Sequence, residues 1–156
     1  MTDVVDQQTR SRMMAGIKGK NTKPEVALRR ALHACGFRFR LHSSNVFGRP
    51  DLLFPKYRAV VFVHGCFWHR HIGCRYCSTP STRTEFWQDK FAANITRDNR
   101  VRTQLRSDGW RIAVVWECQL RTPVDIDATA EVMARWLQSD QPEIEIGRSA
   151  TLLTAR

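Results

Sequence analysis

The sequence predicts an α/β fold in which helices flank a small mixed β-sheet. Helical and strand-like patterns follow one another in the order helix, three strands, helix, strand, helix. The chain has 156 residues, of which 42 % are hydrophobic and 26 % charged, as in an ordinary globular domain with a substantial core. We expect this domain to span residues 22–138, with a basic arm before it (1–21) and a tail after it (139–156).

The first helix is predicted to begin at Thr22, because Thr22-Lys23-Pro24-Glu25 has the spacing of a capping box. Apolar residues recur at helical spacing as far as Cys35, and Gly36 is a natural stop. Residues 37–41 alternate between apolar and basic side chains, which predicts a half-buried strand. A turn-rich loop, residues 45–50, follows.

Two apolar runs, residues 51–54 and 59–63, predict adjacent strands with a turn between them. After a loop rich in Ser, Thr and Pro, Thr82-Arg83-Thr84-Glu85 repeats the capping-box spacing and predicts the start of a long helix that Gly109 ends. Residues 110–116 predict another buried strand, and residues 125–138 predict a final amphipathic helix.

The formal net charge of +10 and the pI of about 10.1 favour a polyanionic partner. No apolar run approaches the roughly 20 residues that span a bilayer, and the first residues lack the pattern of a signal peptide. We therefore expect no membrane partner and a cytoplasmic location. In that compartment the five cysteines are expected to be metal ligands or buried thiols rather than disulfides.

Residues 64–74 concentrate two cysteines and three histidines, the side chains that zinc selects. Cys66, His71 and Cys74, joined by the distant Cys118, predict a closed tetrahedral site of the structural kind. Cys77 is a rival fourth ligand, because Cys74 and Cys77 also have the spacing of a metal knuckle. The same segment offers imidazoles that can move a proton near neutral pH.

Carboxylates and histidines suggest a hydrolytic site. Asp51 opens one predicted strand and His64 follows the next, an arrangement in which nucleases hold magnesium. A metal knuckle would fix His69 rigidly, and Asp98 is placed to orient a histidine. Asp51 also suits a turn position, and Glu25 also suits the third position of a capping box.

Aromatic and basic residues suggest contact with nucleic acid. Phe67 and Trp68 lie between the proposed ligands, where a core role is unexpected, and could wedge between base steps. Phe86 and Trp87 form a second pair, for which a core role is equally consistent. Phosphate contacts are expected from basic residues of the arm and helices, namely Arg10, Arg12, Lys18, Lys20, Arg29, Arg30, Arg97, Arg100, Arg102 and Arg106.

From about Thr9 to about Leu120 the chain resembles the very short patch repair endonucleases of bacteria. Five motifs carry the resemblance: His64-Gly65-Cys66-Phe67-Trp68-His69, Gly48-Arg49-Pro50-Asp51, Thr84-Glu85-Phe86-Trp87, Gly109-Trp110-Arg111 and Val115-Trp116-Glu117-Cys118. The resemblance implies a fold like that of type II restriction endonucleases. It also implies nicking of DNA on the 5′ side of the thymine in T:G mismatches left by deamination of 5-methylcytosine.

The active site that this resemblance implies comprises Asp51, His64, His69, Glu25 and Asp98. In it Asp51 holds Mg²⁺ with help from the backbone carbonyl of Val63, and His69 is the general base that Asp98 orients. Restriction-type nucleases carry an acid-x-lysine motif where this chain has Phe62-Val63-His64. Histidines are therefore expected to replace that lysine.

The resemblance also implies a structural Zn²⁺ held by Cys66, His71, Cys74 and Cys118. It further implies that Phe67, Trp68 and Trp87 intercalate beside the mismatch. The expected partner is double-stranded DNA with a T:G mismatch, bound by a monomer, and repair proteins that act after the nick are further candidates. Two alternatives are a zinc-stabilised DNA-binding module without catalysis and a restriction-type endonuclease that cuts both strands.

Overall fold

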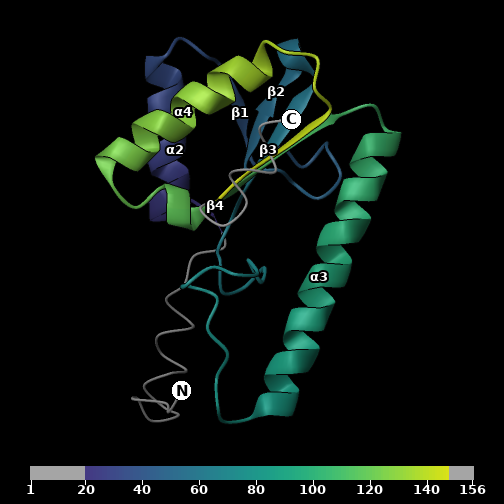
Figure 1. Cartoon of the computed structure of the whole chain (residues 1–156). Helices are drawn as coiled ribbons and strands as arrows, with labels where there is room; N and C mark the ends of the chain where they lie inside the picture. The colour runs from purple at the N-terminus through teal and green to yellow at the C-terminus, as the bar shows by residue number, and fades with distance from the viewer. Residues whose placement is uncertain (1–19, 148–156) are drawn as a thin grey trace.

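A computed structural model describes residues 20–147, which form three α-helices, two short 3-10 helices and five strands (Figure 1). The helices are α2 (Lys23–Ala34), α3 (Thr84–Ser107) and α4 (Pro123–Leu137). The strands are β1 (Arg40–Leu41), β2 (Leu52–Phe54), β3 (Ala59–His64), β4 (Arg111–Trp116) and β5 (Glu143–Ile146). No helix among the described residues is long and apolar enough to cross a membrane.

The strands form one mixed sheet in the order β1-β2-β3-β4-β5. The first three strands are antiparallel neighbours, whereas β3–β4 and β4–β5 are parallel. The pairing of β3 with β4 runs from Ala59 opposite Arg111 to His64 opposite Trp116. The predicted α/β class and the mixed sheet are therefore confirmed.

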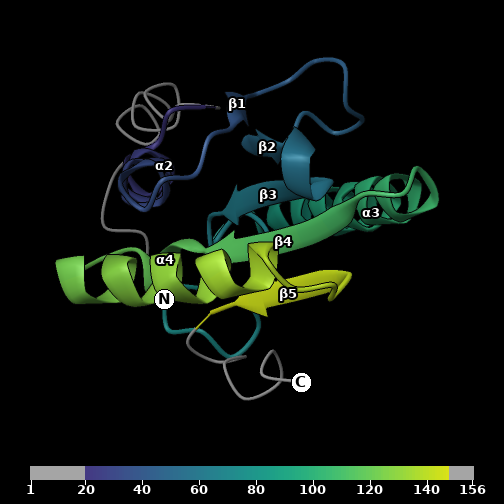
Figure 2. The same cartoon turned by 90° about the horizontal axis from the view of Figure 1, so that it is seen from above.

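The two faces of the sheet bury different side chains, because successive strand residues point to opposite sides. On one face Val61 packs in a core with Leu28 of α2 and Met133 of α4. On the other face Val60 packs in a second core with Leu105 of α3 and the cysteines Cys66 and Cys118. Figures 1 and 2 show α2 and α4 together beside the strands, with α3 lying apart from them. The Cys/His segment thus shares a face with α3.

The helix starts illustrate where local signals succeed and fail. The Thr22 hydroxyl caps α2 by accepting from the backbone N–H of Glu25, as predicted. The second predicted capping box is wrong, because α3 is preceded by Arg83 in a left-handed conformation (φ 51°) and no side chain caps it there. That backbone conformation starts the helix one residue later than Thr82 would require.

Two strands differ from the sequence expectation. Only Arg40–Leu41 of the predicted strand 37–41 pairs in the sheet, while Phe37 and Phe39 pack their rings against Phe54. Within the range expected to be a tail, Glu143–Ile146 adds a parallel edge strand to β4, and Ile146 is buried. The strand is short and half polar, so its pattern gives little indication of a partner.

Candidate functional site

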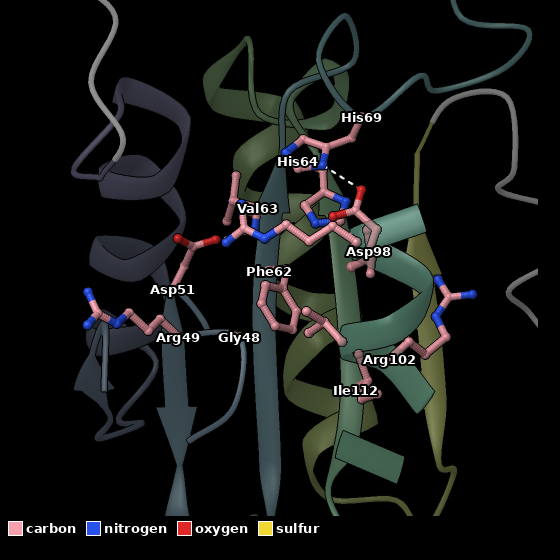
Figure 3. Close-up of a pocket in the computed structure, with 13 residues that line it drawn as sticks. Gly48, Arg49, Asp51, Phe62, Val63, His64, His69, Asp98, Arg102 and Ile112 are labelled. Atoms are coloured by element: carbon pink, nitrogen blue, oxygen red, sulfur yellow. Dashed lines mark hydrogen bonds and ion pairs between the residues drawn. The ribbon is translucent and has the colours of Figure 1, made fainter. Parts of the chain in front are cut away.

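A pocket opens where the ends of β2 and β3 face α3 (Figure 3). Figure 3 shows Asp51 on one side of this pocket and the pair His69 and Asp98 on the other. His64, Arg97 and Arg102 also line it. The sheet thus brings together side chains from three separate segments of the chain.

Asp51 is held at the start of β2 by its neighbour strand. The backbone N–H of Val63 donates to Oδ2 of Asp51 at 2.7 Å. Burial raises the pKa of Asp51 to about 6; the N–H of Val63 and the two histidines His42 and His69 oppose this rise, and Glu25 adds to it. One carboxylate oxygen is therefore fixed by the backbone, while the residue lines the pocket.

Glu25 reaches this site from α2 and is only 2 % exposed. Its Oε1 atom makes a short hydrogen bond with Nε2 of His42, and the guanidinium of Arg29 lies 3.6 Å away. His42 was not predicted from the sequence as a site residue. One feature of the sequence could have indicated it: His42 directly follows a predicted strand, and only the turn-rich loop separates it from Asp51.

His69 and His64 stack on one another beside Asp98. Nδ1 of His69 lies 2.7 Å from Oδ2 of Asp98, and the two imidazoles are parallel with centroids 3.8 Å apart. Burial and the adjacent His69 lower the pKa of His64 to about 3. For Asp98, burial favours the neutral acid, but the hydrogen bond with His69 and the nearby histidines outweigh it and lower the pKa.

This arrangement suits a proton acceptor. With Nδ1–H of His69 assigned as the donor to the carboxylate, Nε2 carries the lone pair. The aspartate stabilises the imidazolium that forms when Nε2 takes a proton. The group can therefore deprotonate a water molecule near a substrate in the pocket.

Cys66, His71, Cys74 and Cys118 form a second cluster, on the α3 side of the sheet. Their sulfur and nitrogen atoms lie within 4.8 Å of one another, and Nδ1 of His71 is 3.6 Å from Sγ of Cys66 and 3.5 Å from Sγ of Cys118. Among the described residues, Cys77 is not part of this group. The donors are those that suit a closed metal site.

The Cys/His cluster is packed against the end of β4, and Cys118 lies just after that strand. Trp116 ends β4 just before Cys118, and its ring stacks on His71 with centroids 4.3 Å apart and planes 5° apart. The carboxylate of Glu117 accepts from the backbone N–H of Cys66 at 3.1 Å. Contacts beyond the four candidate ligands therefore support the loop, as is usual around metal sites.

The aromatic residues form one cluster between the Cys/His loop and α3. Phe67 lies edge-on to Trp68 at 5.1 Å and contacts both Trp87 and Phe91. Phe67 and Trp68 are half-buried, whereas Trp87 is 4 % exposed and packs against them. Trp87 thus lies beside Phe67 and Trp68 but is buried, which matches the core role that the sequence also allowed.

The predicted phosphate-contacting residues have different surroundings. Arg10, Arg12 and Lys18 lie outside the described residues, and Lys20 is exposed. Arg97 lines the pocket, as does Arg102, which pairs with Glu143 at 3.7 Å.

Comparison with known proteins gives consistent matches. A family model described as DNA mismatch endonuclease Vsr matches residues 2–75. DNA mismatch endonuclease Vsr of Escherichia coli is 38 % identical over 99 % of this chain and 100 % of its own length. The type II nicking enzyme V.XorIIP of Xanthomonas oryzae is 48 % identical over 77 % of this chain and 88 % of its own length. The type II nicking enzyme V.NmeAIP of Neisseria meningitidis is 42 % identical over 78 % of this chain and 86 % of its own length.

Proposed function

This chain belongs to the DNA mismatch endonuclease Vsr family and is a DNA nicking endonuclease, and we propose that it acts on T:G mismatches with Mg²⁺. The proposed cut lies on the 5′ side of the thymine, in mismatches that arise when 5-methylcytosine is deaminated. The observation that carries the proposal is the placement of Asp51 and the His69–Asp98 pair on opposite sides of one pocket. We further propose that the mixed sheet is of the restriction-endonuclease type.

The acidic side of the pocket suits a magnesium ion. Magnesium is held by few carboxylates, with water and phosphate completing its shell. Asp51 has one oxygen fixed by the N–H of Val63, so the carboxylate is oriented before a cation arrives. We assign Asp51 and the backbone carbonyl of Val63 as its ligands. When bound, the ion would neutralise charge that develops on the scissile phosphate.

The histidine side of the pocket would supply the base. Nε2 of His69 would accept a proton from the attacking water, while Asp98 keeps the ring in place. His64, with its pKa lowered to about 3, stays neutral at physiological pH and adds no positive charge that would oppose protonation of His69. Glu25 would complete the site beside Asp51.

We assign a structural Zn²⁺ to Cys66, His71, Cys74 and Cys118. A tetrahedral zinc with bonds of about 2.1 Å to nitrogen and 2.3 Å to sulfur separates these ligand atoms by about 3.6 Å. The distances from His71 to two of the sulfurs, 3.5 and 3.6 Å, fit this value. Because His69 lies between two proposed ligands in the chain, the metal would also hold the base in place.

Recognition would combine local DNA deformation with phosphate contacts. A mismatched step is easier to unstack than a paired one, so a wedge binds there at lower cost. Phe67 and Trp68 are proposed to form this wedge, with the buried Trp87 as their support. Four basic residues of the arm are proposed to contact phosphates, namely Arg10, Arg12, Lys18 and Lys20. We expect the protein to act as a monomer in the cytoplasm, with other repair proteins acting after the nick.

One assay tests the proposal. Duplexes labelled at each end, with a T:G pair or with the matched T:A and C:G pairs, are incubated with the zinc-loaded protein and Mg²⁺. The expected result is a single nick 5′ of the mismatched thymine, with the matched duplexes intact. DNA binding without nicking would instead indicate a non-catalytic module, and cutting of both strands of a matched duplex would indicate a restriction enzyme.

A further inference from the structure

Glu25, His42 and Asp51 form a polar group beside the pocket, and each comes from a different segment. Glu25 lies in the first turn of α2, His42 directly follows β1, and Asp51 directly precedes β2. The backbone N–H of His42 donates to the carbonyl of Asp51 at 3.4 Å, so the antiparallel pairing of β1 and β2 sets these two residues side by side. Candidate ligand atoms of all three side chains lie within 4.8 Å of one another.

A single ring nitrogen of His42 faces both carboxylates. Nε2 makes the hydrogen bond with Oε1 of Glu25 and lies 3.9 Å from Oδ1 of Asp51. A carboxylate as buried as that of Glu25 requires a hydrogen-bonded partner, and Arg29 approaches it only to 3.6 Å. His42 is therefore the close partner of Glu25 and the side chain that stands between the two acids.

The backbone of His42 supports a specific role for this residue. Its φ angle of 45° is in the left-handed region, which residues other than glycine rarely occupy. Such conformations persist where the surrounding contacts determine them strongly. The N–H bonded to Asp51 and the ring bonded to Glu25 are two such contacts.

We propose that His42 is a positioning residue of the nuclease centre, which holds the Asp51 carboxylate in the orientation that presents Oδ1 to a divalent cation. The N–H of Val63 restrains only the other oxygen, Oδ2. On the Oδ1 side His42 is the neighbour, with Nε2 3.9 Å away. Without His42 the carboxylate keeps only the hydrogen bond from Val63, and its position relative to Glu25 is restrained less. The inference rests on the proposed function in that Asp51 is taken as the metal ligand.

The test compares His42→Ala with His42→Gln in the full-length, zinc-loaded chain. Binding of Mn²⁺ is titrated by electron paramagnetic resonance of the free ion, and Asp51→Asn sets the background. Loss of a residue that orients a ligand typically weakens metal binding by roughly 10–100-fold, which is the loss expected for His42→Ala. His42→Gln should stay within about threefold of the wild type, because its amide can donate to Glu25. His33→Gln, an exposed histidine of α2, is the matched control.

The magnesium dependence of nicking gives a second measurement. His42→Ala should need a higher Mg²⁺ concentration for half-maximal rate, with the maximal rate approached at saturation, and His42→Gln should restore the wild-type dependence. Equal Mn²⁺ affinity of His42→Ala and wild type, or no rescue by His42→Gln, would overturn the inference. If His42→Ala does not fold, His42→Asn, whose shorter amide cannot span to Glu25, takes its place. A wild type that binds Mn²⁺ but does not nick would refute the proposed function, and the Mn²⁺ titration would still decide the role of His42.

Discussion

Nδ1 of His69 and Oδ2 of Asp98 are hydrogen bonded at 2.7 Å, although the two residues are 29 positions apart in the chain. His69 belongs to the loop after β3, and Asp98 belongs to α3. The bond therefore ties the Cys/His loop to the helix that covers this face of the sheet. Because it commits Nδ1 to the carboxylate, it leaves Nε2 as the atom that can exchange a proton with water.

The pair of His69 and Asp98 should control the rate of the chemical step. His69→Ala should slow the chemical step by roughly 10²–10⁴-fold, the usual contribution of a general base. Asp98→Asn should slow it less, because the base remains but loses its orienting charge. Single-turnover nicking of a T:G duplex measures both effects. Asp89→Asn, an exposed aspartate of α3, is the control and should nick at the wild-type rate. Loss of zinc from His69→Ala would show that His69 is a ligand and leave His71 as the candidate base.

Asp51 should separate catalysis from binding. Asp51→Ala is expected to abolish nicking while affinity for the mismatched duplex survives, since a negative charge near the phosphate is removed. Gel-shift titration and nicking of the same duplex measure the two properties. Parallel loss of binding and nicking would contradict the assignment of Asp51 as a metal ligand.

Asp51 should also lower stability at neutral pH. Its pKa is raised to about 6, so the folded chain favours the protonated acid, and that advantage is lost as the pH rises through 6. From an ordinary pKa of about 3.9, the ionised form costs on the order of 3 kcal/mol. Asp51→Asn should therefore increase the free energy of unfolding at pH 7.5 without added magnesium, and the gain should vanish below about pH 4. Urea denaturation at both pH values measures the free energy of unfolding. Equal stability of Asp51→Asn and the wild type at pH 7.5 would contradict a raised pKa of Asp51.

One zinc per chain is expected, and two cysteine variants identify the fourth ligand. Cys118→Ser should lose the metal and unfold at lower temperature, because zinc binding and folding are coupled. Cys77→Ser should keep both zinc and stability, since Cys77 lies outside the cluster. Elemental analysis and thermal denaturation measure the two properties. The reverse result, with zinc lost only from Cys77→Ser, would exclude Cys118 as a ligand.

Trp68 should contribute to mismatch discrimination. Aromatic stacking on a base is worth roughly 1–3 kcal/mol, so Trp68→Ala should weaken binding of the T:G duplex by about tenfold or more while binding of the matched duplex changes little. Trp110→Ala, which removes a tryptophan that packs against Arg58, is the control. Competition binding with both duplexes measures the ratio of affinities, and an equal loss on both would show that Trp68 is no wedge.

Local parts of this protein follow directly from its sequence. The cap of α2 by Thr22 and the apolar run of β3 depend on neighbouring residues, and both are found where predicted. Cys66, His71 and Cys74 meet because few residues separate them, so closing the loop between them costs little entropy. The family motifs are likewise short continuous segments, and they supplied Asp51, His64 and His69 as candidate site residues.

Distant partners were decided only by the tertiary structure. Cys118 contacts His71 across 47 positions because β4 lies parallel to β3, and no local pattern distinguishes it from Cys77. His42 contacts Glu25 across 17 positions, because β1 and α2 meet beside the pocket. Residue types alone indicate which side chains can bind metal or move protons. Their partners were set by strand order and helix packing, which depend on the core of the whole chain rather than on neighbouring residues.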